Sequence, residues 1–98
     1  MVMTKPVQGW LKCEITEGMF PDEFGVIGYT TDKNMFSFFI HNSLVDEKEQ
    51  MVMVSVNGCE DDFCYVLLPC EPYGHPSRMV KVPATSVKIM SWEKVHAA

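Results

Sequence analysis

Positive charge is scarce in this sequence, and long apolar runs are missing from it. Eight Lys and Arg residues stand against thirteen Asp and Glu residues, which gives a formal net charge of −5 at pH 7. Binding to a phosphate backbone needs clustered cations that displace counterions, so no nucleic acid is expected as a partner. No apolar run approaches the roughly 20 residues that span a bilayer, and residues 1–8 lack the apolar stretch of a secretory signal. We therefore expect a cytoplasmic protein that does not bind a membrane.

Several motifs of catalytic and cofactor-binding proteins are also missing. The chain has no Ser or Cys nucleophile signature, no Gly-rich phosphate loop and no dinucleotide fingerprint. It contains no internal repeat, linker or low-complexity segment. Its 98 residues suit one domain, and a chain of this length buries roughly 65% of its unfolded surface. We expect a single domain over residues 1–98, with an ordered core at about 8–93 and no cofactor.

The clearest pattern that is present lies in residues 51–70. Val residues alternate with other residues over 51–56, which is the period of a half-buried strand. Asn57 and Gly58, followed by three acidic residues, are expected to reverse the chain, and residues 63–68 return as a second apolar run. This stretch predicts a β-hairpin at the centre of the fold.

Other short apolar stretches follow at intervals near ten residues. We predict strands at residues 10–15, 26–29, 35–41, 51–56, 63–68, 79–82 and 87–92. Residues 1–8 are expected to form a loose leader, and residues 42–50 a polar connection with at most one helical turn, capped by Ser43. The predicted fold class is all-β: a small antiparallel barrel or strongly bent sheet of five to seven strands, with little helix.

The closing segment 80–87, VKVPATSV, resembles the strand, one-turn 3₁₀ connection and strand that end SH3-like barrels. In this resemblance Pro83 lies at the turn and Val87 begins the last strand. The similarity covers eight of the 98 residues. The aromatic opening motif and the paired Trp residues of true SH3 domains are missing. The resemblance therefore implies an SH3-like small barrel, without implying recognition of Pro-rich peptides.

The cysteines raise the question of a metal site. Cys59, Cys64, Cys70 and His75 lie within residues 59–75, and zinc accepts thiolate and imidazole ligands. Their spacings, C-x4-C, C-x5-C and C-x4-H, do not match the paired ligands of a zinc knuckle. Cys64 also alternates with apolar residues like a core residue. We predict no metal, and we expect all four cysteines, including Cys13, to be reduced and buried.

Two loops, 17–24 and 70–78, are candidates for ligand binding. The second is rich in Pro and carries a His three residues before the only Arg of the chain, a pair suited to gripping an anion or carboxylate. The candidate ligand-binding residues, for a small molecule or a peptide, are Phe20, Tyr73, His75 and Arg78. The alternative is a small barrel enzyme of ribonuclease or toxin type that uses His75 and Arg78, although an acidic protein is unusual among RNA-cutting enzymes.

The period of two also predicts an unusually apolar outer surface. If the Val and Ile residues of the strands point inward, several Met and aromatic residues must point outward. These candidate interface residues are Trp10, Met35, Phe39, Met51, Met53, Met90 and Trp92. Exposed patches of this composition mark partner surfaces, and identical patches meet in a two-fold dimer. The sequence predicts a non-catalytic binding module that forms a homodimer, unless loops or the C-terminal tail cover this face.

Overall fold

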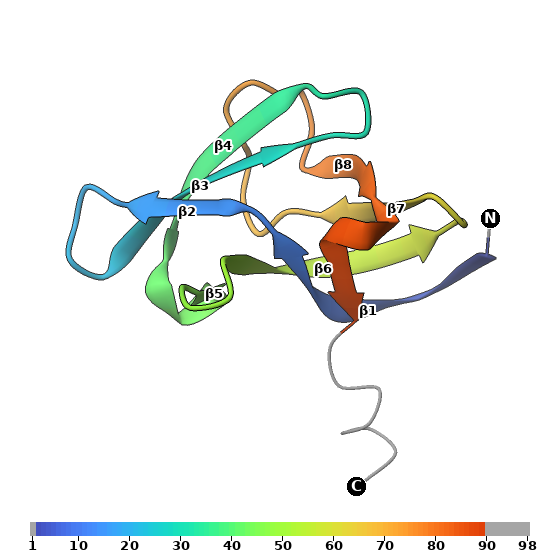
Figure 1. The fold of residues 1–98 in the computed structure, drawn as a ribbon, viewed down its shortest axis with the longest axis horizontal. Helices are drawn as coiled ribbons and strands as arrows, with labels where there is room; N and C mark the ends of the chain where they lie inside the picture. Colours follow the sequence, from blue (N-terminus) through green and yellow to red (C-terminus); the bar gives the residue numbers. More distant parts are fainter. Residues whose placement is uncertain (1, 90–98) are drawn as a thin grey trace, which may run out of the picture.

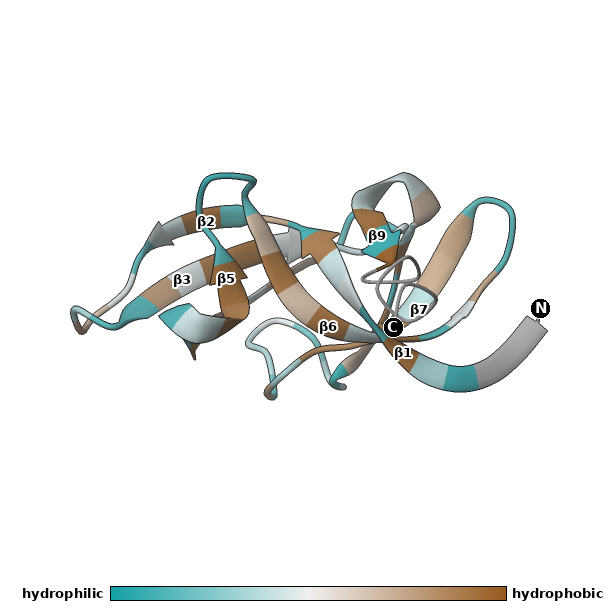
Figure 2. Ribbon diagram, turned by 90° about the horizontal axis from the view of Figure 1, so that it is seen from below, coloured by the Kyte–Doolittle hydropathy of each residue, from teal (hydrophilic) through white to brown (hydrophobic). Residues whose placement is uncertain are grey.

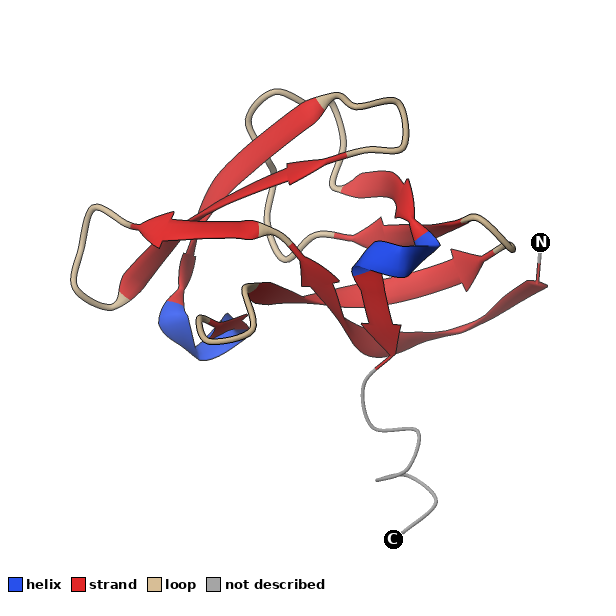
Figure 3. Cartoon of the chain, viewed as in Figure 1, coloured by secondary structure: helices blue, strands red, loops and turns tan. Residues whose placement is uncertain are grey.

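The computed structural model of the protein describes residues 2–89. Over this range the chain is all-β, without an α-helix, and forms two antiparallel sheets (Figures 1 and 3). The strands are β1 (Val2–Lys12), β2 (Glu14–Glu17), β3 (Glu23–Tyr29), β4 (Met35–His41), β5 (Val45–Asp46), β6 (Met51–Cys59), β7 (Phe63–Leu67), β8 (Met79–Pro83) and β9 (Val87–Ile89). Two short 3₁₀ helices, η1 (Asn42–Leu44) and η2 (Ala84–Ser86), connect strands. None of the helices in residues 2–89 has the length and apolarity needed to cross a membrane.

The larger sheet has six strands and the smaller sheet has three. The larger sheet has the order β8-β7-β6-β1-β9, with β5 paired to β6, and the smaller one has the order β2-β3-β4. Strands β1 and β2 are consecutive and separated only by Cys13, so one nearly continuous segment passes from the larger sheet into the smaller one (Figure 1). The result is the strongly bent all-β arrangement expected from the sequence, and the two sheets do not close into a single barrel.

The inner faces of the two sheets share one core. Its buried apolar residues are Leu11, Cys13, Val26, Phe36, Phe38, Val52, Val54, Val56, Cys64, Val66, Leu68, Val80 and Val82. Strands β6, β7 and β8 each alternate strictly between buried and half-buried residues, as the period of two requires. Figure 2 shows the apolar segments concentrated on strands, with mostly hydrophilic connections between them. Gly28 faces Phe36 in the smaller sheet, and a Cβ at this position would clash with the Phe36 ring, so the placement of the ring depends on this glycine.

The central hairpin forms as predicted, with its turn at the acidic tip, but Asn57 and Gly58 are not part of that turn. Asn57 and Gly58 belong to β6, and the pairing between β6 and β7 shifts register between Val56 and Gly58. The chain reverses instead over residues 60–62, where Glu60 N donates to Phe63 O at 2.7 Å. The predicted Asn-Gly turn was wrong because a glycine in a strand can also mark a bulge.

The N-terminal segment was also predicted wrongly. Residues 1–8 were expected to be a loose leader, but β1 begins at Val2 and pairs with β6 from its first residue. The pairing is irregular between Met3 and Val7, and Pro6 falls in this interval. Proline lacks the N–H of a regular ladder, so an irregular position is where a strand tolerates it.

The closing segment has the local structure expected from the sequence. Strand β8 runs into η2, with Pro83 as the residue before the 3₁₀ turn, and β9 begins at Val87 and pairs with β1. Val87 packs against the core, and Ile89 lies on the same side of β9, as expected, but is 43% exposed near the end of the strand. Near the middle of the chain, the helical turn η1 is capped by the ring of His41, which accepts from Ser43 N, and not by Ser43 itself.

Candidate functional site

The predicted interface residues divide between two surfaces. Trp10 lies directly opposite Met53 in the β1–β6 pairing, and Met51 lies on the same outer side of the larger sheet. Met35 and Phe39 lie on β4, in the smaller sheet. Met90 and Trp92 lie outside the described residues. The inner faces of the two sheets pack on a common core, so their outer faces are separate surfaces.

The outer face of the smaller sheet is rich in exposed apolar side chains. Tyr29 and Met35 are opposite each other in the β3–β4 pairing and are 54% and 52% exposed. Phe39, on the same side of β4, is 42% exposed. Tyr73 joins them from the loop 70–78, because its backbone bridges to Ser37, and it is 68% exposed. We call this set, Tyr29, Met35, Phe39 and Tyr73, the small-sheet face.

The register explains why these four side chains gather. Residues paired across antiparallel strands point to the same side, so Tyr29 accompanies Met35, and Tyr73 accompanies Ser37 between Met35 and Phe39. Tyr29 was not among the predicted interface residues. The sequence feature that could have identified Tyr29 is the period of two over residues 23–29, which places Tyr29 on the side opposite the buried Val26.

Loops contact part of each edge of the smaller sheet. Ser37 N donates to Tyr73 O at 3.0 Å and Tyr73 N donates to Ser37 O at 2.7 Å, which covers the free edge of β4. On β2, Ile15 N donates to Gln50 Oε1 at 3.0 Å. Covered edges prevent indiscriminate strand addition. The face of this sheet is therefore better suited to contact a partner than its edges are.

The candidate ligand-binding residues do not converge on one site. Phe20 lines a hollow of about 420 Å³ formed by the turn between β2 and β3, together with Glu47. His75 and Arg78 line a different hollow of about 330 Å³, within their own loop. Tyr73 contributes to the small-sheet face. The structure thus separates the two loops that the sequence placed together as one ligand site.

The hollow at His75 also contains a carboxylate. Glu71 lines it together with His75 and Arg78. Arg78 is engaged in the fold, since its Nε and Nη2 both donate to Leu68 O, at 3.1 and 2.9 Å. His75 Nδ1 lies 2.9 Å from Ser77 O and 3.3 Å from Ser77 N. Both side chains therefore stabilise the loop itself, through bonds to its backbone.

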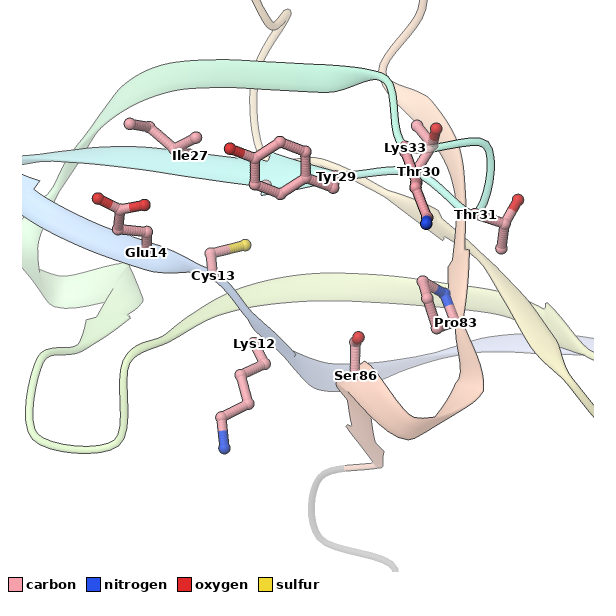
Figure 4. Close-up of a pocket in the computed structure, with 11 residues that line it drawn as sticks. Lys12, Cys13, Glu14, Ile27, Tyr29, Thr30, Thr31, Lys33, Pro83 and Ser86 are labelled. Atoms are coloured by element: carbon pink, nitrogen blue, oxygen red, sulfur yellow. The ribbon is translucent and has the colours of Figure 1, made fainter.

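A third hollow, of about 380 Å³, lies where the two sheets meet (Figure 4). It is lined by residues of the β1–β2 junction, the end of β3 and η2, including Cys13, Tyr29 and Ser86. Figure 4 shows Lys12 extending away from Cys13 and Tyr29. Burial raises the pKa of Cys13 to about 12, so this thiol stays protonated at neutral pH.

The cysteines differ from the expectation. Cys59 and Cys64, which face each other across the β6–β7 hairpin, form a disulfide, whereas Cys13 and Cys70 are free. Burial raises the pKa of Cys70, and the nearby Arg78 opposes this shift. The disulfide occupies two of the four sulfur and nitrogen ligands considered for zinc. In residues 2–89, no group of three or more His, Cys, Asp or Glu residues is arranged to hold a metal ion.

Comparison of the chain with protein-family models, with curated proteins and with solved structures finds no match.

Proposed function

We propose that this protein is a non-catalytic interaction module that forms a homodimer through the small-sheet face. The observation that carries the proposal is the exposure of Tyr29, Met35, Phe39 and Tyr73 on one side of the smaller sheet. Four large apolar side chains, each more than two-fifths exposed, are costly to leave in water.

The composition of the small-sheet face suits a subunit contact. Tyr and Met are enriched at interfaces, because Tyr contributes a large contact area and Met adapts to its neighbour. Polar residues flank the apolar ones: Glu23 and His41 are paired at the far end of the β3–β4 ladder. An apolar centre with a polar rim is the usual anatomy of an interface, and a second copy of the chain supplies the same surface under two-fold symmetry.

We also propose that this fold is related to the SH3-like barrels. Its support is the closing segment 80–87, in which β8, η2 and β9 follow one another in the order that the resemblance implies. The pairing of the last strand β9 with the first strand β1 agrees with it.

Sedimentation equilibrium at tens of micromolar tests the dimer. We expect the wild type to sediment as a dimer and Phe39→Asp to sediment as a monomer, because the carboxylate would be buried unpaired in the contact. Met19→Asp is the matched control. It makes the same apolar-to-acid change at a side chain that is 75% exposed, in the turn between β2 and β3 and outside the small-sheet face. This control should remain a dimer, and thermal unfolding should show that both variants fold.

A monomeric wild type would end the dimer proposal. A Phe39→Asp variant that dimerises as tightly as Met19→Asp would show that the contact lies on another surface, such as the outer face of the larger sheet.

The second candidate function is a ribonuclease-type enzyme, and one observation favours it. Glu71 lines the same hollow as His75 and Arg78, which supplies a carboxylate beside an imidazole and a guanidinium. The bonds from Arg78 to Leu68 O weigh against it, since they occupy two donors that a phosphate would need. RNA cleavage by the wild type that is lost in both His75→Ala and Glu71→Gln would support this function. An absence of cleavage by the wild type would reject it.

A further inference from the structure

The disulfide between Cys59 and Cys64 closes a small acidic tip. The two cysteines are directly opposed in the β6–β7 register and lie five residues apart in the sequence. Between them are Glu60, Asp61 and Asp62, all exposed. A bond that closes so short a loop restricts the unfolded chain less than a long-range bond does. Its contribution to the stability of the whole fold is therefore smaller than that of a long-range bond.

The two cysteines differ in their exposure to solvent. Cys64 is 3% exposed and belongs to the shared core, whereas Cys59 is partly exposed and packs at the margin of that core. Thiol–disulfide exchange requires an incoming thiolate to reach one sulfur directly, so access decides which sulfur is attacked. Cys59 is the more exposed residue of the pair, so attack is expected there, and it expels Cys64 as the leaving group.

The acidic tip also selects among incoming thiols. The attacking species is a thiolate, and the local field of the neighbouring Asp61 and Asp62 carboxylates repels an anion that approaches within a Debye length. A thiol that also carries a cationic group is attracted by the same carboxylates. The tip therefore favours cationic reductants over anionic ones.

Opening of the bond would loosen the tip without unfolding the hairpin. The ladder pairs Ser55 with Leu67 and Val56 with Val66, independently of the disulfide. The tip is tied to the closing turn by one bond from Ala84 N to Asp62 O, at 2.9 Å. Ala84 begins η2, which leads into β9, so the amide of Ala84 reports on the state of the tip.

We propose that Cys59–Cys64 is a reversible thiol-exchange site that reacts at Cys59 and is selective for cationic thiols. A thiolate RS⁻ attacks Sγ of Cys59, forms a mixed disulfide there and releases Cys64, which takes a proton from water. A second RS⁻ attacks the RS sulfur, forms RSSR and releases Cys59, which is protonated in turn. Two electrons pass from two thiols to the protein disulfide, and an oxidant of disulfide type reverses the exchange.

Three small thiols of similar size test the selectivity: cationic cysteamine, neutral 2-mercaptoethanol and anionic 2-mercaptoethanesulfonate. Rates are compared per thiolate at low salt, with mass spectrometry to locate the adduct. We expect cysteamine to react roughly tenfold faster than the sulfonate, the adduct to form on Cys59, and the ratio to fall towards one at high salt. Asp61→Asn/Asp62→Asn should reduce the ratio, whereas the control Glu47→Gln/Glu49→Gln should leave it unchanged.

A second readout follows the tip itself. On reduction of the full chain, amide exchange at Ala84 should accelerate at least tenfold while exchange at Val66 in β7 stays unchanged. Titration of the unreduced, denatured protein should find two thiols, and four after reduction. Four thiols before reduction, equal rates for the three reagents, or an adduct on Cys64 would each overturn the proposal.

Discussion

The two sheets carry similar side chains on their outer faces but expose them differently. On the larger sheet, Met53, Tyr65 and Met79 occupy outward positions of β6, β7 and β8, and all three are half-buried. On the smaller sheet, Tyr29, Met35 and Phe39 are 42–54% exposed. Outward direction alone therefore does not make a side chain available to a partner.

The difference comes from the width of the two sheets. On the larger sheet, outward side chains cover one another: the Phe63 and Tyr65 rings meet edge to face at 5.4 Å, and Lys81 Nζ lies 3.9 Å from the centre of the Phe63 ring. The smaller sheet has three strands, and its outward positions include Gly25, which offers no side chain. The small-sheet face is therefore the more exposed of the two outer faces.

The largest expected difference in stability is between substitutions on the two sides of β4. Phe36 is fully buried and Phe39 lies on the small-sheet face. Phe36→Ala should lower the free energy of unfolding by about 3–5 kcal/mol, because it removes a core ring and leaves a cavity. Phe39→Ala should change it by less than about 0.5 kcal/mol in the monomer. Urea unfolding at a concentration below dimerisation measures both. Equal losses would show that Phe39 is covered within the chain.

The next largest expected effect is on the pH dependence of stability, through Cys13 at the junction of the two sheets. The pKa of Cys13 is raised from 9.0 to about 12 by burial, so the folded state retains this proton where the unfolded state has lost it. Stability should therefore fall as pH rises from about 9 to 12, by about 1.4 kcal/mol per pH unit. Cys13→Ala removes this dependence. The difference in urea stability between wild type and variant, at pH 8, 9, 10 and 11, measures the slope. A constant difference would mean that the junction is open to water.

The smallest effect tests the covering of the larger sheet. Lys81→Gln removes the cation over the Phe63 ring and should lower the free energy of unfolding by about 0.5–1 kcal/mol. Lys88→Gln, at an exposed position of β9, is the control and should be nearly neutral. Urea midpoints at equal slope distinguish the two. If both variants have the same stability, the contact between Lys81 and Phe63 does not help to cover that face.

Much of the fold could be predicted from period and turn chemistry. The apolar alternation located β4, β6, β7 and β8, because a strand with one buried face must repeat every two residues. It failed for β1, whose residues up to Pro6 show no such period, and for the turn after β6, where a glycine marks a bulge. In both places the pairing with a distant strand decided the structure.

The candidate site was less predictable, because it depends on which elements become neighbours. Met35 and Phe39 were identified by their outward direction on β4. Their association with Tyr73 depends on a bridge between Ser37 and a loop 36 residues further along the chain, which no local pattern indicates. The pairing of Cys59 with Cys64 likewise depends on the register of the hairpin.

The sequence by itself determined the fold class, the central hairpin and the inward Val residues, since each follows from interactions between near neighbours in the chain. Only the tertiary structure decided which outward residues are covered and which form the small-sheet face. The physical reason is that exposure depends on the side chains of adjacent strands, and the distribution of strands between two sheets of unequal width is a long-range property of the fold.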